Sequence, residues 1–516
     1  MTRRELLRLA GAGALGSTIG CTSGTSVLRL GGTLNNQIGF EPDREIALTA
    51  SPAEVQILAG TPTKVWKFAG RVLKGPAETL KEIDNSYLGP IIDVSKGDKI
   101  RIHFSNQLPE SSIVHWHGLD IPSAMDGHPS SVIQPGKEFT YEFEVANRAG
   151  LYWYHPHPHG RTATQIYGGL AGVFIVRDEE ETALKLPSGK HEILCVLQDR
   201  QFDQDNQLVY LGSGMPGRMG AMNGFFGDEV LINGKRRKEL PLATNVYRFR
   251  ILNASNARTY RLAWSDKTPI TVIGTDGGLL EKPVVQQFVT LAPAQRVDVL
   301  LDLSERPIGS TIQLLSSAFP SSEAGSTGMG RGMMMDGGSN SVRNGAALTL
   351  LNLRVDRHED VTFQLPERLT TFDTSWKGAP EATVRRIPLV FQSGQWLLGG
   401  RTFEMTKVDL DETVAASSVQ IWEIANLGGM MGMQMAHPIH LHGPQFRVLS
   451  RVRGPATSLH AGVVDVGWTD TVLVMPGDTV QIQVNFTKHP GIYLYHCHIL
   501  EHEDMGMMRN FRVTPK

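Results

Sequence analysis

The segment Gly491-Ile-Tyr-Leu-Tyr-His-Cys-His498 stands near the far end of this chain of 516 residues. The same pattern occurs much earlier as Gly150-Leu-Tyr-Trp-Tyr-His-Pro-His157, with the glycine, both tyrosines and both histidines at matching positions. A shorter repeated segment precedes each one, Val114-His-Trp-His-Gly118 in the first half and Ile439-His-Leu-His-Gly443 in the second. An internal repeat of this kind predicts two homologous domains that flank a middle one.

The repeats contain four His-X-His pairs. They are His115/His117, His155/His157, His440/His442 and His496/His498. On a β-strand, residues two apart point to the same face, so each pair would present two imidazoles side by side. A single pair is weak support for a site, because such pairs also arise by chance. Eight imidazoles exceed the needs of one zinc ion and indicate a cluster of several metals between the first and last domains.

Cys497 lies between two of these histidines, and strand alternation puts its side chain on the opposite face. His502 and Met507 follow it, and His437 lies upstream. Two histidines, a thiolate and a weak axial methionine define a blue-copper electron-transfer site. The alternatives are an inert core thiol for Cys497 and ordinary packing for Met507. The spacing favours a second metal site, one residue away from the histidine cluster.

Four segments resemble the copper-binding motifs of the multicopper oxidases. They are His115-Trp-His-Gly118, His155-Pro-His157, His437-Pro-Ile-His-Leu-His442 and the run from His496 to Met507. The resemblance extends from about residue 45 onwards. It is to bacterial three-domain enzymes of the laccase and copper efflux oxidase type, whose domains are cupredoxin-like β-sandwiches.

The resemblance implies four copper ions per chain, with a distinct set of ligands for each type. Type 1 copper would be bound by His437, Cys497, His502 and Met507, type 2 by His115 and His440, and the type 3 pair by His117, His155, His157, His442, His496 and His498. A reducing substrate would give electrons one at a time at the type 1 site. They would pass through Cys497 to the trinuclear centre, where four electrons reduce dioxygen to two waters.

Reduction of dioxygen also consumes protons, so carboxyl groups are expected close to the cluster. Asp126 corresponds in position to the family's acidic residue near type 2 copper, and Glu503 resembles a second one. The alternative for each is a solvated or structural carboxylate. His159 extends the second pair into a third alternating histidine, but the family spacing makes it either a bystander or a residue behind the ligands.

The expected fold is all-β, with three cupredoxin-like Greek-key β-sandwich domains. Many short strand-like runs and abundant glycine and proline support it. The predicted parts are an export signal at 1–25, a first domain at 44–180, a second at 185–355 with a Met-rich loop at 325–340, a connector at 356–385 and a third domain at 386–516.

Methionines collect in three places among Gly, Arg, Ser and Asp rather than among aliphatic residues. The groups are Met215, Met219 and Met222; Met329, Met333, Met334 and Met335; and Met430, Met431, Met433 and Met435. Because thioethers select Cu(I), they suggest a capture surface for cuprous ion near the type 1 site. The candidate contacts for substrate copper are Met333, Met334, Met335, Asp336, Met433 and Met435. The alternative is a loop without a binding role.

Three functions compete on this basis. The first is a metallo-oxidase in copper homeostasis that converts Cu(I) to Cu(II), and the second is a laccase-like oxidase of phenols and aromatic amines. The third is a copper-storage protein of the cell envelope without catalysis. Family members of that last kind have lost copper ligands, whereas this chain has all twelve.

The start of the chain predicts its destination. Arg3-Arg4 precedes a short apolar run, which indicates a twin-arginine signal, recognition by export machinery and a periplasmic or envelope location. That run is too short to span a membrane. A lipid anchor at Cys21 is the less favoured alternative, because Thr18 suits that cleavage poorly. The formal net charge of −2 gives no reason to expect nucleic acid as a partner, and a monomer is expected.

Overall fold

Short runs of alternating apolar and polar residues form most of the regular structure. In β5 (Lys99–Asn106), for example, Ile100, Ile102 and Phe104 are buried while the residues between them are more exposed. The computed structural model describes residues 39–212, 214–236, 239–324, 342–372, 384–426, 435–455 and 457–516, all within one structural unit. Strands account for 47% of the chain and helices for 11%, which confirms the all-β prediction.

The first sandwich encloses a core that includes Phe104, Trp116, Tyr141 and Tyr154. Its sheets have the strand orders β2-β1-β5-β7 and β3-β4-β9-β8-β6. The remaining strands are β1 (Arg44–Val55), β2 (Thr63–Lys74), β3 (Leu80–Lys81), β4 (Ile91–Ser95), β6 (Val114–His117), β7 (Glu138–Glu144), β8 (Gly150–Pro156) and β9 (Gly172–Arg177).

The second sandwich encloses a core that includes Phe249, Tyr260 and Trp264. Its sheets have the orders β11-β10-β13-β18-β15-β16 and β12-β20-β19-β14-β17. The strands are β10 (Glu192–Arg200), β11 (Glu229–Ile232), β12 (Glu239–Ala243), β13 (Val246–Asn253), β14 (Tyr260–Trp264), β15 (Ile270–Thr275), β16 (Gly278–Gln286), β17 (Val289–Leu291), β18 (Arg296–Asp302), β19 (Thr311–Ser316) and β20 (Leu348–Arg357).

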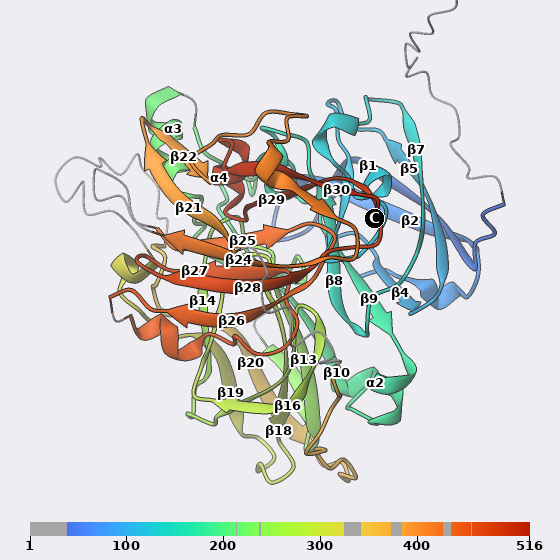
Figure 1. The fold of residues 1–516 in the computed structure, drawn as a ribbon. Helices are drawn as coiled ribbons and strands as arrows, with labels where there is room; N and C mark the ends of the chain where they lie inside the picture. The colour runs from blue at the N-terminus through green and yellow to red at the C-terminus, as the bar shows by residue number, and fades with distance from the viewer. Residues whose placement is uncertain are drawn as a thin grey trace, which may run out of the picture. The chain divides into compact units, whose positions relative to one another are not determined.

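The third sandwich encloses a core that includes Trp396, Trp422 and Phe511. Its sheets have the orders β22-β21-β24-β28-β26 and β23-β30-β29-β25-β27. The strands are β21 (Val384–Gln392), β22 (Gln395–Leu398), β23 (Thr413–Ala415), β24 (Val419–Asn426), β25 (His437–Leu441), β26 (Phe446–Val452), β27 (Thr471–Val474), β28 (Thr479–Asn485), β29 (Gly491–Cys497) and β30 (Met508–Thr514). Figure 1 shows strands of the three sandwiches.

All three sandwiches share one connectivity. In each, the first sheet contains one parallel pair (β1/β5, β10/β13 and β21/β24), and the second sheet contains another (β4/β9, β12/β20 and β23/β30). Antiparallel neighbours then lead from β9 to β8 and β6, and from β30 to β29 and β25. The middle sandwich has β20, β19 and β14 in the same order. Strand β14, which contains no histidine, thus occupies the place of the two strands that begin the His-X-His pattern.

Helices are few and short in the part of the chain that the structure describes. The α-helices are α1 (Thr162–Tyr167), α2 (Glu179–Ala183), α3 (Gly214–Asn223) and α4 (Leu500–Asp504). The 3-10 turns are η1 (Ala77–Thr79), η2 (Ser123–Met125), η3 (Pro129–Ser131), η4 (Gly189–His191), η5 (Ser321–Ala324), η6 (Leu410–Glu412) and η7 (Ser458–Gly462). None of the helices in the described parts of the chain is long and apolar enough to cross a membrane.

Helices α1 and α4 connect the first and third sandwiches. The carboxylate of Asp504 accepts hydrogen bonds from the backbone N–H groups of Thr162 (2.9 Å) and Ala163 (3.0 Å) at the start of α1. Helix α1 follows His157 in sequence, and α4 follows His498. This contact therefore ties together the two segments that follow the His-X-His pairs.

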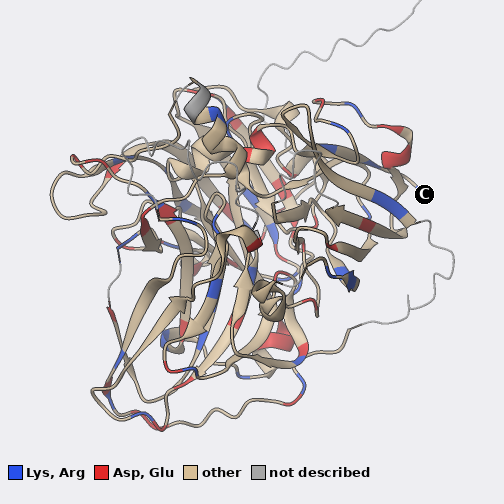
Figure 2. Cartoon of the chain, turned by 90° about the vertical axis from the view of Figure 1, so that its left-hand side faces the viewer, with Lys and Arg blue, Asp and Glu red and all other residues tan. Residues whose placement is uncertain are grey.

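Charged residues of both signs are interspersed over the strands and loops, without a large region of one sign (Figure 2). This distribution agrees with the near-zero net charge. The predicted signal at 1–25 and Met-rich loop at 325–340 lie outside the described residues, as does part of the predicted connector. The proposed domain limits stay predictions.

A glycine of β9 is required by the neighbouring histidine-bearing strand. Tyr154 of β8 lies directly opposite Gly172, and its buried hydroxyl donates to the carbonyl oxygen of Pro90 (2.8 Å). A Cβ atom at Gly172 would lie 2.1 Å from the ring carbon Cζ of Tyr154. That overlap can be relieved only by moving the ring or the strand.

We therefore expect Gly172→Ala to destabilise the protein by about 1–3 kcal/mol, the usual cost of overpacking a core. Denaturant unfolding measures the change. Gly212→Ala is the control, because no atom lies within 4 Å of the Cβ position there. Equal unfolding midpoints for the two variants would contradict this account.

Candidate metal centres

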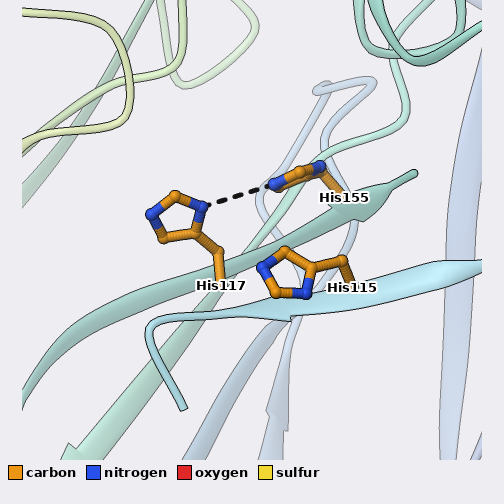
Figure 3. Close-up of side chains that lie close together, drawn as sticks. All are labelled: His115, His117 and His155. Carbon is orange, nitrogen blue, oxygen red and sulfur yellow. Dashed lines mark hydrogen bonds between the residues drawn. The ribbon is translucent and has the colours of Figure 1, made fainter. Parts of the chain in front are cut away.

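The eight histidines of the four His-X-His pairs are brought together between the first and third sandwiches. Strand pairing sets them in register, because His115 lies opposite His155 on β6 and β8, and His440 lies opposite His496 on β25 and β29. All eight side chains are buried. Figure 3 shows how His115 and His117 of β6 lie close to His155 of the adjacent strand.

Histidines of the two sandwiches also contact each other directly. The ring of His115 stacks on that of His442, and the ring of His117 stacks on that of His440, each with centroids 3.7 Å apart. The Nε2 atom of His496 lies 3.1 Å from Nε2 of His442 and 3.3 Å from Nε2 of His157. Ring nitrogens from both ends of the chain thus converge on a small volume.

Backbone carbonyl groups fix which nitrogen of several rings carries the proton. His115 Nδ1–H donates to the carbonyl oxygen of Asp126 (2.7 Å), and His440 Nδ1–H donates to that of Asp470 (2.8 Å). Because a carbonyl oxygen can only accept, the lone pair of each ring must be on Nε2. Both Nε2 atoms are buried and have no hydrogen-bond partner among the described residues. This is the tautomer of a metal ligand.

His155 and His496 are held in the same way. Their Nδ1–H groups donate to the carbonyl oxygens of Pro156 (2.9 Å) and Cys497 (3.1 Å). Burial lowers the pKa of both rings well below its usual value, and neighbouring histidines lower it further. Both rings are therefore neutral at neutral pH, with Nε2 lone pairs available to a metal.

Three groups of histidines have their nitrogens within 4.8 Å of one another. They are His115/His117/His155, His115/His440/His442 and His157/His442/His496. Two neutral imidazoles whose lone pairs face each other have no proton to share, so they cannot form a hydrogen bond. A bound cation can accept both lone pairs instead. Imidazole is a common ligand of copper. The donor set therefore fits a cluster of several copper ions.

The two predicted carboxyl groups lie beside this cluster. Asp126 Oδ2 accepts from His442 Nδ1–H (2.7 Å). Glu503 lies behind two other rings, with Oε1 3.5 Å from His157 Nδ1 and Oε2 3.2 Å from His496 Nδ1. Both oxygens of Glu503 are buried. Burial, and next the nearby carboxylate of Asp504, raise the pKa of Glu503 well above its usual value.

Cys497 points away from the histidine cluster to a second group. Its Sγ atom lies 3.4 Å from His437 Nδ1 and 3.7 Å from His502 Nδ1. His502 Nε2–H donates to the carbonyl oxygen of Met222 (3.0 Å), so the lone pair of Nδ1 faces the sulfur. Met507 is buried in the same core as Cys497.

Burial raises the pKa of the Cys497 thiol, so the protein alone does not favour the thiolate. A metal ion is the partner that deprotonates such a thiol. The set of two imidazoles, a thiol and a nearby buried thioether fits copper at this second site.

The remaining sequence predictions have different outcomes. Met333, Met334, Met335, Asp336 and Met433 lie outside the described residues. Met435 is described, and it is buried in the core that contains Cys497 rather than on the surface. His159 is exposed and packs against Phe403, with ring centroids 4.9 Å apart.

Sequence reasoning missed two residues that contact the histidines, Trp396 and Asp470, and the arginine that pairs with Asp470. Trp396 is buried, and its ring lies 4.7 Å from that of His437 and 4.8 Å from that of His502, where it keeps water away. Asp470 accepts from His117 Nε2–H (3.1 Å) and is ion-paired with Arg296. Burial raises the pKa of Asp470, but Arg296 and His117 together hold it well below its usual value.

One sequence signal, the glycine that ends the His-Trp-His-Gly motif, marks the place where Asp470 approaches the backbone. Gly118 of the His-Trp-His-Gly motif has a positive φ of 88°, and a Cβ atom there would lie 2.4 Å from Asp470 Oδ2 and 2.9 Å from Arg296 Nη2. The motif thus needs glycine where the carboxylate and the guanidinium approach the backbone. Without the fold, that partner could not be named.

Known proteins share both the sequence and the fold of this chain. Residues 64–181, 205–338 and 373–516 match three family profiles described as multicopper oxidase. The multicopper oxidase mco of Staphylococcus aureus is 34% identical over 445 residues, which cover 86% of this chain and 85% of that protein.

Two further comparisons involve proteins with a named activity. The laccase of Bacillus subtilis is 29% identical over 494 residues, covering 88% of this chain and 91% of the laccase. The crystal structure of a multicopper oxidase from Campylobacter jejuni, described as a metallo-oxidase, superposes with a TM-score of 0.71 at 28% identity. That match covers 92% of this chain and 91% of the other. This chain belongs to the multicopper oxidase family and is a copper-dependent oxidase.

Proposed function

We propose that the chain binds four copper ions at twelve residues and oxidises its substrate at a site distinct from the one that reduces dioxygen. Copper at the Cys497 site supplies one-electron oxidation, and copper at the histidine cluster supplies the four-electron reduction of dioxygen to water. The observation that carries the proposal is the strand β29 and its continuation, where Cys497 faces one group while His496 and His498 face the other.

The proposed division of the ligands among the copper types follows the family resemblance, and the two groups of side chains support it. His437, Cys497, His502 and the buried Met507 would hold type 1 copper; His115 and His440 would hold type 2; and His117, His155, His157, His442, His496 and His498 would hold the type 3 pair. Carbonyl groups that fix the histidine tautomers support the assignment of His115 and His440.

The backbone of residues 496–498 connects the two groups covalently. Electrons that enter beside Cys497 have only one residue to cross in either direction before they reach a histidine of the cluster. The buried ring of Trp396 covers His437 and His502 and excludes water from that side. The chain thus holds the two sites close together while keeping their environments separate.

Glu503 is the residue that we propose to deliver protons. Its raised pKa keeps a proton on one carboxyl oxygen, and those oxygens face the Nδ1 sides of His157 and His496. Asp126, whose Oδ2 accepts from His442, is the second proposed proton-relay residue. Both groups lie within reach of the cluster without being ligands themselves.

We propose Cu(I) as the preferred substrate. Helix α3 lies over the Cys497 site, because the carbonyl oxygen of Met222 accepts from His502 Nε2–H. Met219 of the same helix is 44% exposed, so a soft thioether faces solvent close to the proposed point of electron entry. The similarity to the Campylobacter metallo-oxidase supports this preference. Oxidation of phenols and aromatic amines is the second candidate, supported by the similarity to the Bacillus laccase.

The compartment is proposed from the sequence alone. Arg3-Arg4 before a short apolar run supports export by a twin-arginine route to the periplasm or cell envelope. A monomer is proposed because both groups of ligands are complete within one chain. Lipid attachment at Cys21 is the less favoured alternative.

The first prediction concerns copper. We expect the reconstituted, air-oxidised protein to contain about four coppers per chain and to show an intense blue band with a near-ultraviolet shoulder. Cys497→Ser should abolish the blue band, because the thiolate is its source. Cys195→Ser is the control, since that buried thiol lies in the middle sandwich. A blue Cys497→Ser protein would refute the assignment of the type 1 site.

The second prediction concerns proton delivery. Glu503→Gln keeps the shape of the side chain but removes its proton, so we expect kcat to fall by about 100-fold or more, as for a lost general acid. Copper content and the blue band should stay unchanged. The measurement is steady-state oxygen consumption with electrochemical or phenolic donors.

Glu501→Gln is the matched control for Glu503→Gln. Glu501 is also buried on α4, but it accepts from Tyr210 (2.6 Å) and Asn256 (2.8 Å) rather than facing the histidines. We expect its kcat to stay close to that of the unchanged protein. Similar losses in both variants would show that any buried carboxyl group on α4 is needed, and would remove Glu503 from this role.

The third prediction tests Cu(I) capture by the stretch at 325–340. The chain on either side is held together by a hydrogen bond from Phe319 N–H to the carbonyl oxygen of Gly345 (3.0 Å), so a short glycine-serine linker can replace the stretch. We expect Cu(I) turnover at low concentration to fall about tenfold, equivalent to about 1.4 kcal/mol, while phenol turnover is retained. Undiminished Cu(I) oxidation would contradict the capture role.

A further inference from the structure

Asp470 contacts histidines of both outer sandwiches. Its backbone carbonyl oxygen accepts from His440 Nδ1–H (2.8 Å) in its own sandwich. Its carboxylate Oδ1 accepts from His117 Nε2–H (3.1 Å), which belongs to the first sandwich. The side chain is fully buried, so these contacts are made without competition from water.

Asp126, in the first sandwich, makes the corresponding two contacts, with its carboxylate reaching the third sandwich. Its carbonyl oxygen accepts from His115 in the first sandwich, and its carboxylate accepts from His442 in the third. Each aspartate thus orients one histidine of its own sandwich through the backbone and one of the other sandwich through the side chain. We refer to Asp126 and Asp470 as the reciprocal aspartates.

The two carboxylates select different nitrogens for the cluster. Asp126 holds the proton of His442 on Nδ1, which leaves the lone pair on Nε2. Asp470 holds the proton of His117 on Nε2, which leaves the lone pair on Nδ1. That Nδ1 atom lies 3.5 Å from Nε2 of His155, inside the cluster. Asp470 therefore decides which face of the His117 ring can bind a metal.

The orientation of Asp470 depends on the middle sandwich. Arg296 at the start of β18 is buried, and its Nη1 and Nη2 groups donate to the two oxygens of Asp470. Other N–H groups of the guanidinium donate to the carbonyl oxygens of Leu151 (2.9 Å) and Asp276 (3.1 Å). These bonds leave the carboxylate one orientation, with Oδ1 toward His117.

Asp276 binds both the backbone of Arg296 and the residues on either side of Asp470. Its Oδ1 accepts from the backbone N–H of Arg296 (2.7 Å). Its Oδ2 accepts from the hydroxyl of Thr469 and from the backbone N–H of Thr471 (3.3 Å), on either side of Asp470. The middle sandwich thus fixes both the side chain and the backbone of Asp470.

Resting on the proposed copper cluster, we infer that Asp470 is a positioning residue that makes His117 present Nδ1 to copper, and that Arg296 keeps Asp470 in place. The middle sandwich contributes no histidine to the cluster. Through Arg296 it nevertheless determines the geometry of one ligand.

Asp470→Asn tests the inference because an amide cannot satisfy both partners. If the amide nitrogen faces Arg296, two donors oppose each other. If it faces His117, the ring must accept at Nε2 and carry its proton on Nδ1, so the lone pair for copper is lost. The first outcome breaks the pair with Arg296 that keeps residue 470 in place, and the second removes the His117 lone pair; in both, the size of the side chain is unchanged.

The measurement is a chelator titration of copper-loaded protein, monitored at the blue band for the Cys497 site and at the near-ultraviolet shoulder for the cluster. We expect Asp470→Asn to weaken retention of cluster copper by about 10- to 100-fold, the usual effect of losing a partner behind a metal-bound histidine. The blue band should respond to the chelator as in the unchanged protein. Arg296→Lys, which cannot reach both oxygens in parallel, should weaken the same signal.

Asp199→Asn is the control. Asp199 is buried and accepts from Arg258 Nε (2.8 Å), so it forms an ion pair with an arginine of the same sandwich rather than with a histidine. It should lower the unfolding temperature of the copper-free protein without loosening cluster copper. Equal loosening by Asp199→Asn, or none in Asp470→Asn and Arg296→Lys, would overturn the inference. If the protein without any substitution held no copper at the cluster, the proposed function and this inference would both be overturned.

Discussion

The structure depends on holding eight buried imidazoles with their lone pairs facing one another. A buried polar atom without a partner costs about 1–3 kcal/mol, and several ring nitrogens here are in that state. Two kinds of interaction in the fold offset this free-energy cost. Backbone carbonyls and carboxylates bind the outward N–H groups, and cross-sandwich stacking at 3.7 Å fixes the planes of the rings. The remaining lone pairs are left for copper, which makes the metal a stabilising partner of the fold.

The sequence predicted the parts of the site that follow from strand geometry. Because side chains on a strand alternate strictly, the spacing of His496, Cys497 and His498 was enough to assign them to opposite faces. The all-β class followed from the many short strand-like runs, the abundant glycine and proline, and the family resemblance. Predictions of this kind hold because a strand gives its residues little freedom.

The parts that the sequence did not reveal depend on loops and on other sandwiches. Asp126 follows its histidine His115 by 11 residues, whereas Asp470 follows His440 by 30, so no repeat of spacing relates the two. Arg296 comes from the middle sandwich, where β14 has lost the histidine pattern. Met435 was expected on a surface because of its glycine-rich surroundings, yet it packs into the core. Tertiary packing, rather than local pattern, decided each of these.

The interleaving of the two outer sandwiches has a consequence for biosynthesis. Ring nitrogens of His157 and His496 lie 3.3 Å apart, although 339 residues separate them in the chain. At the usual pace of translation, the first of these residues leaves the ribosome about 20–70 seconds before the second. During that interval the growing chain carries only half of the cluster. The group His115/His117/His155 is within it, but the other two histidine groups need residues of the third sandwich. The complete cluster is therefore a checkpoint on completeness, since a truncated or undocked chain cannot form all three groups.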